Sequence, residues 1–307
     1  MSAPSETGPG FLIGSSRFAA PPLAAGLYLV ATPIGHLRDI TLRALETLAA
    51  AAVVFCEDTR VTAKLLTRYG LRKELKPYHD HNAAKVRPLI LNRVAAGESV
   101  ALTCDAGTPL ISDPGFRLVQ EAIGLNLPVE MIPGPSAPLM ALVLSGLPTD
   151  RFLFAGFLPA RAGERRRRLA ELKDVPATLL FFDTPPRIAD TLTAIEAVLG
   201  PRPVCIAREL TKLHQEVLRG KPREVLAAIA ARGGLRGEIT LVVAPPGGEH
   251  APDADADVER ALGEALRSMS TSRAAAHVAR KFNRPRRAVY DLALKLRELS
   301  AGEPGEN

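Results

Sequence analysis

Charged and imidazole side chains gather in loops that follow short apolar, strand-like segments of the sequence. The loop "EDTR" (57–60) follows "AVVF", "YHDHN" spans 78–82, and "CDAGTPLISDPG" (104–115) follows "SVALT". A carboxylate or a neutral imidazole in such a loop can accept a proton from a hydroxyl group, and an arginine can bind a phosphate through its planar fork of donors. The candidates for this chemistry are Asp58, Arg60, His79, His81, Asn82, Asp105 and Asp113.

Each candidate also has a plainer interpretation. Asp58 and Arg60 can form a helix cap with an ion pair, and "YHDHN" can be an ordinary polar loop. Two histidines at i and i+2 without further ligands are poor evidence of a metal site, so we expect no metal. We favour Asp58, with His79 as a second candidate, as the catalytic base, and we expect Arg60, His81 and Asn82 to contact the substrate.

The elements that must position these loops follow an alternating pattern. The expected strands of the first half are residues 27–33, 52–58, 99–105 and 128–134. Helices are expected from Thr41 and from Thr62, and this alternation predicts an α/β domain with a mainly parallel sheet. Ligands of such sheets bind at the carboxyl ends of the strands. Here those ends carry Gly- and Pro-rich turns, which let a backbone approach a ligand closely, so we expect a ligand site along that edge.

The pattern restarts after "SGLPTDR", which places a domain junction near residue 148. A second set of strands is expected at 151–157, 177–187, 203–210 and 238–246. The stretch "GGEHAPDADAD" is typical of a linker, and "SRAAAHVARKF" and "RPRRAVYDLALKL" predict two short helices. We therefore expect a disordered leader at 1–25, α/β domains at 26–148 and 149–247, and a basic helical segment at 258–300.

Composition limits the class of protein. A chain of 307 residues is long enough for two domains, and 47% apolar with 23% charged residues is typical of a soluble globular protein. No stretch approaches the roughly 18 consecutive apolar residues of a membrane helix, so no membrane partner is expected. The three widely spaced cysteines predict neither a disulfide framework nor a zinc site and favour a reducing cytoplasm.

The net charge of +6 is distributed unevenly. Residues 273–297 hold eight Lys and Arg against one Asp, and residues 161–168 hold five Arg against one Glu, so the rest of the chain is acidic. Two basic patches on an acidic body favour a polyanionic partner. A solvated helix face explains either patch taken alone.

The sequence resembles a known family through seven motifs in order. They are "LVATPIGHLRDIT", "CEDTRVTAKLL", "YHDHN", "CDAGTPLISDPG", "IPGPSA", "FAGFLP" and "FFDTPPRI". Together they resemble the ribosomal RNA branch of the tetrapyrrole-methylase superfamily, and more closely the bacterial enzymes that methylate a ribose 2′-hydroxyl of a cytidine in 16S ribosomal RNA. The Gly-x-Gly-x-x-Gly and P-loop patterns of nucleotide-binding proteins are absent.

The resemblance implies two α/β domains, S-adenosyl-L-methionine (SAM) in a cleft between them, a homodimer, and the small ribosomal subunit as partner. Carried over by position, it implies these cofactor contacts: Pro33, Gly35, Asp105, Ala106, Gly107, Thr108, Ser136, Ala137, Phe182, Ile239 and Thr240. Pro33 to Gly35 replace the Gly-rich first loop of the porphyrin-modifying members, which leaves a role toward RNA open for this loop. Expected substrate contacts also include Arg187, unless it only holds its loop, and Arg286 and Arg287 of the basic tail.

Two other functions fit parts of the sequence. A corrinoid or porphyrin methyltransferase shares the fold but does not need a separate basic tail. A helix-turn-helix regulator with a ligand-sensing body would use the tail but does not need the "EDTR" and "YHDHN" loops at the same edge.

Overall fold

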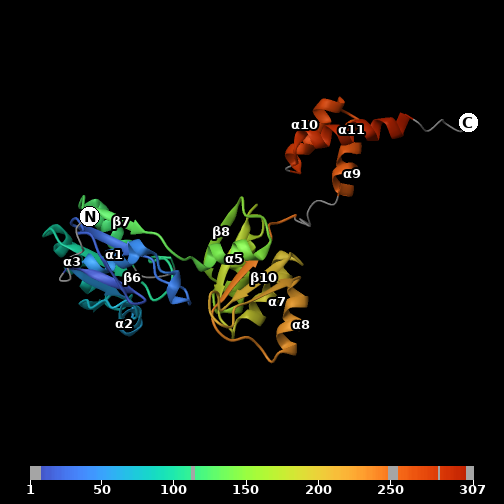
Figure 1. Ribbon diagram of the computed structural model, residues 1–307. Helices are drawn as coiled ribbons and strands as arrows, with labels where there is room; N and C mark the ends of the chain where they lie inside the picture. Colours follow the sequence, from blue (N-terminus) through green and yellow to red (C-terminus); the bar gives the residue numbers. More distant parts are fainter. Residues whose placement is uncertain (1–7, 112–114, 248–254, 283, 302–307) are drawn as a thin grey trace, which may run out of the picture. The chain divides into compact units, whose positions relative to one another are not determined.

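The computed structural model describes residues 8–111, 115–247, 255–282 and 284–301. It divides into two compact units, Met1–Ala244 and Pro245–Asn307. The first unit contains two lobes, each built on a five-stranded sheet with helices on both faces (Figure 1). The predicted α/β class is therefore confirmed. The candidate Asp113 lies outside the described residues.

The first sheet is parallel and has the order β5-β4-β6-β3-β7. Its strands are β3 (Gly26–Val30), β4 (Val53–Cys56), β5 (Leu75–Pro77), β6 (Ser99–Thr103) and β7 (Val129–Ile132). Its helices are α1 (Leu42–Ala50), α2 (Thr59–Arg68), α3 (Ala83–Ala95) and α4 (Phe116–Gly124), with a 3₁₀ turn at Leu37–Asp39. The loops that follow β3, β4, β5, β6 and β7 all lie at one edge, because the strands run in the same direction.

Alternation along the strands produces two cores in this lobe. Tyr28 and Val30 of β3 pack with α1 and α2, whereas Leu27 and Leu29 pack with residues of α3 and α4. Because both faces are covered, the three central strands β3, β4 and β6 consist almost entirely of buried apolar residues, which is why the sequence indicated them clearly. The edge strands β5 and β7 are partly exposed.

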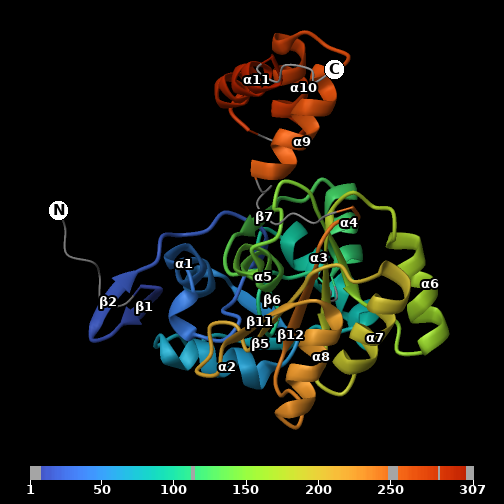
Figure 2. The same ribbon diagram turned by 90° about the vertical axis from the view of Figure 1, so that its right-hand side faces the viewer.

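We predicted a disordered leader at residues 1–25, and this prediction is wrong for residues 8–25, which the structure describes. Strands β1 (Gly10–Ile13) and β2 (Ser16–Ala19) form an antiparallel hairpin, which lies beside α1 (Figure 2). Phe11 is only 2% exposed and belongs to the core under α1 and α2, and the Leu12 amide donates to the Tyr69 carbonyl at 2.7 Å. Residues 1–7 lie outside the described range.

The second sheet has the order β11-β10-β12-β9-β8, and only β8 and β9 pair in parallel. Its strands are β8 (Phe152–Phe157), β9 (Thr178–Asp183), β10 (Val204–Arg208), β11 (Glu216–Gly220) and β12 (Ile239–Val243). Helices α6 (Ala162–Leu172), α7 (Ile188–Leu199) and α8 (Pro222–Ala231) share one core with it. Helix α5 (Ala137–Ser145) packs on the opposite face, against Leu180, Cys205 and Val242.

The position of α5 corrects the predicted domain junction. A boundary near residue 148 assigns α5 to the first domain, but α5 contacts β9, β10, β11 and β12 of the second sheet, and Figure 1 shows it in the second lobe. The chain therefore crosses between lobes one helix earlier, in the segment between β7 and α5. Ile34, which follows β3, packs with Leu210 and α5 in the same small core and joins the two lobes.

The second unit is a three-helix assembly of α9 (Asp255–Leu266), α10 (Thr271–Lys281) and α11 (Arg286–Ala301). The two helices predicted from the sequence correspond to α10 and α11, whereas α9 was not predicted. An apolar core holds the three together, with Leu262, Ala275 and Ala293 fully buried. The exposed Arg286 and Arg287 occupy the first turn of α11. The predicted linker lies mostly outside the described residues.

Candidate active site

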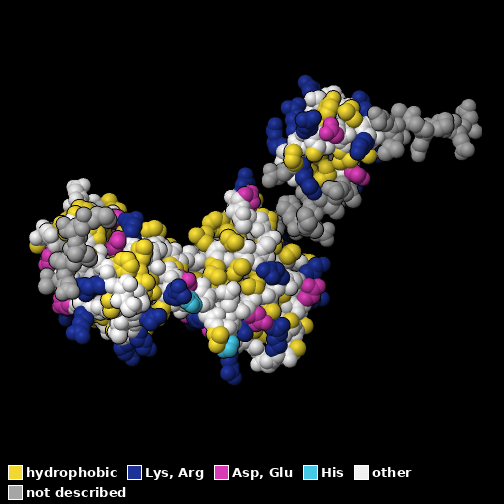
Figure 3. Space-filling view, viewed as in Figure 1, with side chains coloured by type: hydrophobic (Ala, Val, Ile, Leu, Met, Phe, Trp, Pro, Cys, Tyr) yellow, Lys and Arg dark blue, Asp and Glu magenta, His cyan; other side chains and the backbone are white. Residues whose placement is uncertain are grey.

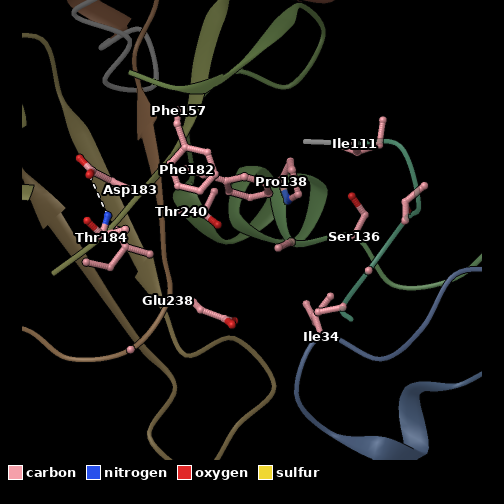
Figure 4. Close-up of a pocket in the computed structure, with 16 residues that line it drawn as sticks. Ile34, Ile111, Ser136, Pro138, Phe157, Phe182, Asp183, Thr184, Glu238 and Thr240 are labelled. Atoms are coloured by element: carbon pink, nitrogen blue, oxygen red, sulfur yellow. Dashed lines mark hydrogen bonds between the residues drawn. The ribbon is translucent and has the colours of Figure 1, made fainter. Parts of the chain in front are cut away.

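A cavity of about 320 Å³ opens where loops of the first lobe face strand ends of the second. Ala106, Gly107 and Thr108 reach it from the loop after β6, and Ser136 and Ala137 reach it from the start of α5. The opposite wall comes from the ends of β8 and β9 and the beginning of β12 (Figure 4). Both lobes thus contribute, and the cavity volume lies in the range typical of small-molecule sites.

Most residues predicted for the cofactor meet at this cavity. The lining includes Ala106, Gly107, Thr108, Ser136, Ala137, Phe182, Ile239 and Thr240. Pro33, Gly35 and Asp105 are not part of the lining, although their neighbours Ile34 and Ala106 are. A cofactor contact for each predicted residue stays a prediction, but the convergence of the eight lining residues from four separate sequence segments is a structural finding.

The sequence did not indicate the other lining residues, which are Ile34, Ile111, Pro138, Phe157, Asp183, Thr184, Gly237 and Glu238. Six of these eight, all except Ile34 and Ile111, come from the second lobe. Only "FFDT", with its carboxylate at a strand end, carried a signal that could have identified Asp183 and Thr184.

The backbone of Gly107 explains why this position is a glycine. Its φ is +79°, a conformation that side chains disfavour, and an added Cβ would lie 3.3 Å from the Ile34 Cγ2 atom. Gly107 and Thr32 exchange two backbone hydrogen bonds, of 2.8 and 3.0 Å. These bonds fix the loop after β6 to the loop after β3 and leave the cavity side of the turn without a side chain.

The second-lobe wall is aromatic and acidic. The Phe182 ring packs edge-on against Phe154 at a centroid distance of 4.9 Å and tilted against Phe157 at 5.5 Å. The Asp183 Oδ1 atom accepts from the Thr184 amide at 2.7 Å, whereas Oδ2 is buried and has no partner among the described residues. Glu238 also lines the cavity and pairs with Lys212 at 3.1 Å.

This lining fits SAM. An adenine ring can pack on the aromatic and aliphatic wall, and the amino and sulfonium groups of SAM carry positive charge that Asp183 and Glu238 complement. The unpartnered Asp183 Oδ2 atom is the specific observation, because buried carboxylate oxygens are normally hydrogen-bonded and a bound donor would satisfy this one.

Asp58 and Arg60 form the ion pair and helix cap of the plainer interpretation. Asp58 caps α2 through the Arg60 amide at 2.8 Å, and its carboxylate accepts from the Arg60 guanidinium at 2.6 to 3.2 Å. The hydrogen bonds from Arg60 lower the pKa of Asp58 to about 2. A carboxylate with so low a pKa is a weak proton acceptor, which counts against Asp58 as the base.

Asp105 differs from Asp58 in this respect. Its Oδ1 atom accepts from the Asp58 amide at 2.9 Å, so it links the loop after β4 to the cavity loop after β6. Burial raises the pKa of Asp105 above its ordinary value, and the Asp58 amide bond opposes this only in part. Of the two described carboxylate candidates, Asp105 is next to the cavity-lining Ala106, and its pKa is raised whereas that of Asp58 is lowered.

The "YHDHN" loop lies farther along the same edge. His79 follows β5, which is two strands away from β6 in the sheet, a lateral distance of roughly 10 Å. Asn82 accepts from the His79 amide at 2.9 Å and donates to the Pro77 carbonyl at 3.0 Å, so it shapes the loop. His79 and His81 stack edge to face at 5.9 Å, and the buried His79 Nδ1 atom has no partner in the described part of the chain.

Of the two roles predicted for Arg187, substrate contact and support of its own loop, the structure shows the second. Its guanidinium donates to the Leu158 carbonyl and lies 3.9 Å from the Asp183 carboxylate. It does not line the cavity. A substrate contact for Arg187 has no support in this geometry.

The Arg-rich segment 161–168 is largely neutralised within α6 and α7. Arg161 pairs with Glu164, and Arg168 with Glu171 at 2.9 Å. Arg165 is 4% exposed and bonds Asp190 and the Ala160 carbonyl. The charge count of this segment therefore overstates its attraction for a polyanion.

Over residues 8–111, 115–247, 255–282 and 284–301, no group of three or more His, Cys, Asp or Glu side chains is arranged to hold a metal ion. The helices in these same ranges include none with the length and apolar character to cross a membrane.

Comparison with known proteins identifies the family. Residues 26–226 match the model of the Tetrapyrrole (Corrin/Porphyrin) Methylases, and residues 252–297 match the RsmI C-terminal HTH domain. Proteins named ribosomal RNA small subunit methyltransferase I are similar along most of the chain. The one from Mesorhizobium japonicum is 50% identical over 96% of this chain and 100% of its own length, and the one from Erythrobacter litoralis is 51% identical over 91% and 98%.

Solved structures show the same fold at low sequence identity. A diphthine synthase superposes with a TM-score of 0.57 at 19% identity, covering 71% of this chain and 89% of its own. A cobalt precorrin-4 methyltransferase superposes with a TM-score of 0.55 at 16% identity, covering 71% and 94%. The chain belongs to the SAM-dependent tetrapyrrole methylase family and, within it, to the group of the ribosomal RNA small subunit methyltransferase I proteins.

Proposed function

We propose that this chain methylates the ribose 2′-hydroxyl of a cytidine in 16S ribosomal RNA, with SAM bound in the cavity between the lobes. One observation carries the proposal. The half-buried carboxylate of Asp105 lies next to the lining of an apolar, partly acidic cavity. The relatives' names supply the RNA, and the basic second unit supplies a surface that suits a polyanion.

SAM provides a methyl group already activated by its sulfonium. The residues of the chain then have to hold the hydroxyl in line with that methyl group, since orientation alone accelerates such a transfer strongly. In this proposal the rigid turn at Gly107 and the aromatic wall at Phe182 would hold the cofactor, and a ribose would enter between the loops after β4 and β5.

Asp105 is the proton acceptor in this proposal, in place of Asp58 and His79. The Asp105 carboxylate would accept the proton of the ribose hydroxyl, and bound SAM would supply the activated methyl group that this oxygen receives. Asp58 orients Asp105 through its amide, and Arg60 keeps Asp58 ionised. His81 and Asn82, in the loop after β5, contact the RNA strand where it enters.

The proposal includes a homodimer and a cytoplasmic location, where the small ribosomal subunit is made. The outward face of α5 supports the dimer, because Val143 is 74% exposed and Leu139, one turn before it, is 49% exposed. The two side chains lie on the same face of α5, and contiguous exposed apolar surface marks interaction sites. Arg286 and Arg287 of the second unit contact RNA phosphates.

The test is to incubate the protein with methyl-labelled SAM and, separately, with small ribosomal subunits, naked 16S RNA, or a porphyrin or corrinoid. We expect label in RNA that survives in an alkali-resistant dinucleotide, since a 2′-O-methyl group blocks alkaline cleavage of the adjacent bond. Label on a base would contradict the 2′-hydroxyl assignment. Label only in the tetrapyrrole would replace the RNA proposal with the small-molecule alternative.

A further inference from the structure

A row of basic side chains runs along α2 and ends at the junction between the lobes. Lys64 and Arg68 are one turn apart and therefore lie on the same face of the helix. Arg38, from the 3₁₀ turn after β3, and Arg68 line one hollow. All three are exposed, and none forms an ion pair with another described residue. We call Arg38, Lys64 and Arg68 the basic ridge.

The ridge adjoins two segments that reach the cavity. On the α2 side, Lys64 lies six residues after Asp58, the N-cap of the helix, whose amide donates to the Asp105 carboxylate beside the cavity lining. At the other end, Arg38 is four residues after Ile34, which lines the cavity. The His36 amide also donates to the Thr211 hydroxyl at 2.9 Å, which ties this end to the second lobe.

The approach of the two lobes at this end is tight. A Cβ on Gly35 would lie 2.5 Å from the Lys212 Cγ atom and 2.9 Å from the Leu210 carbonyl oxygen. The hollow beside it, of about 440 Å³, is lined by Arg38, Arg68 and residues 211–213. Leu213, at its rim, is 93% exposed, so an apolar side chain and two guanidinium groups face solvent together.

Free charge distinguishes the ridge from the Arg-rich α6. Four of the five arginines at 161–168 pair with Glu164, Glu171 or Asp190, and only Arg166 has no ion pair with a described residue. No such carboxylate pairs with the ridge in the described ranges. Figure 3 shows Lys and Arg side chains gathered on the lower edge of the first lobe, where Figure 1 labels α2.

We propose that the basic ridge binds the phosphates of the RNA strand that carries the target nucleotide, and so guides this strand over α2 to the cavity. This inference rests on the proposed RNA methylation. Arginine and lysine side chains with no carboxylate partner suit the phosphodiester backbone. The exposed Leu213 provides an apolar surface for a base beside it. The ridge is an RNA contact of the first unit, separate from the tail.

The experiment compares two full-length variants with equal charge changes. The ridge variant carries Arg38→Glu, Lys64→Glu and Arg68→Glu. The control variant carries Arg117→Glu, Arg151→Glu and Lys173→Glu, three exposed residues on other elements that also form no ion pair with a described residue. Each is measured for SAM-dependent thermal stabilisation, for affinity to the small subunit across salt concentrations, and for KM and kcat of methylation.

We expect the ridge variant to retain its SAM-dependent stabilisation and its kcat at saturating RNA. Its KM for RNA should rise at least tenfold, and the slope of log affinity against log salt should become shallower by about 2, since each lost phosphate contact on a single strand removes about 0.7. The control should differ from the unmodified protein by less than threefold.

Equal behaviour of the two variants would overturn the ridge proposal while leaving the methylation proposal intact. If the unmodified protein transfers no methyl group to RNA, the proposed function itself has failed. If kcat falls with KM unchanged, the ridge acts on the chemical step and does not bind the strand, which also contradicts the inference.

Discussion

Replacing Gly107 with valine tests the cavity as the cofactor site. The φ of +79° at this position costs a residue with a side chain about 1–2 kcal/mol, so Gly107→Val should lower the free energy of unfolding by about 2 kcal/mol. The new side chain would also press on Ile34, whose Cγ2 atom is 3.3 Å from the Cβ position. We therefore expect the cavity to narrow and the SAM dissociation constant to rise at least tenfold.

The measurement is thermal unfolding with and without SAM. At a concentration of 100 times the dissociation constant, SAM should stabilise the unmodified protein by about 2.7 kcal/mol, and the same concentration should stabilise the variant by about 1.4 kcal/mol or less. For a unit of this size, the difference corresponds to roughly 3–5 °C in the SAM-induced shift of Tm.

Gly97→Val is the matched control. Gly97 has φ of +91°, so the backbone cost is similar, but nothing lies within 4 Å of its Cβ position. This variant should lose a similar amount of stability and keep the full SAM-induced shift. An unchanged SAM shift in Gly107→Val, or an equal loss of it in Gly97→Val, would refute the assignment of the cofactor to this cavity.

Other predictions concern the carboxylates and the tail. Asp105→Asn should lower turnover about 10²–10⁴-fold, and a near-normal rate of this variant would exclude Asp105 as the proton acceptor. In the unmodified enzyme, activity should fall as pH drops through the raised pKa of Asp105, because only the ionised carboxylate accepts a proton. Since the folded state binds this proton more tightly than the unfolded state, ionising Asp105 should slightly destabilise the protein as pH rises through the same window. Arg60→Gln should raise the pKa of Asp58 from about 2 toward the ordinary value of 3.8 in a carbon-13 NMR titration, and no change would show that Arg60 is not the cause. Arg286→Glu with Arg287→Glu should weaken RNA binding and reduce its salt slope by roughly 1.4–1.8 without altering SAM binding, whereas unchanged RNA binding would remove these residues from the substrate surface.

The sequence predicted the first lobe and the first-lobe side of the cavity well. Buried parallel strands are nearly continuous apolar runs, and the turn chemistry at their ends is visible in single residues such as Gly107. The short edge strands β5 and β11 were missed, because "LKP" and "EVLRG" carry charged residues and a proline that do not indicate a strand.

Other misses depend on tertiary packing. Helix α5, "APLMALVLS", is apolar on all sides, so its pattern does not reveal which sheet it covers. Phe157 and Glu238 join the cavity only because the second lobe folds against the loop at Ile34. The ion pair that lowers the pKa of Asp58 is local in sequence, but the contrast with Asp105 depends on burial, which the sequence does not give.

The order of strands in the second sheet also has a consequence for synthesis on the ribosome. Strand β12 is the last of the sheet to be made, yet it pairs on both sides, with β9 and β10. Helix α5, which packs against β12, is made roughly a hundred residues earlier, and at about 5–20 residues per second this interval is of order 5–20 s. During this interval the second sheet lacks β12, so part of the apolar surface of α5 has no strand to pack against. The nascent chain should therefore bind a chaperone at α5 until β12 has emerged, while the first lobe, complete at β7, is free to fold first.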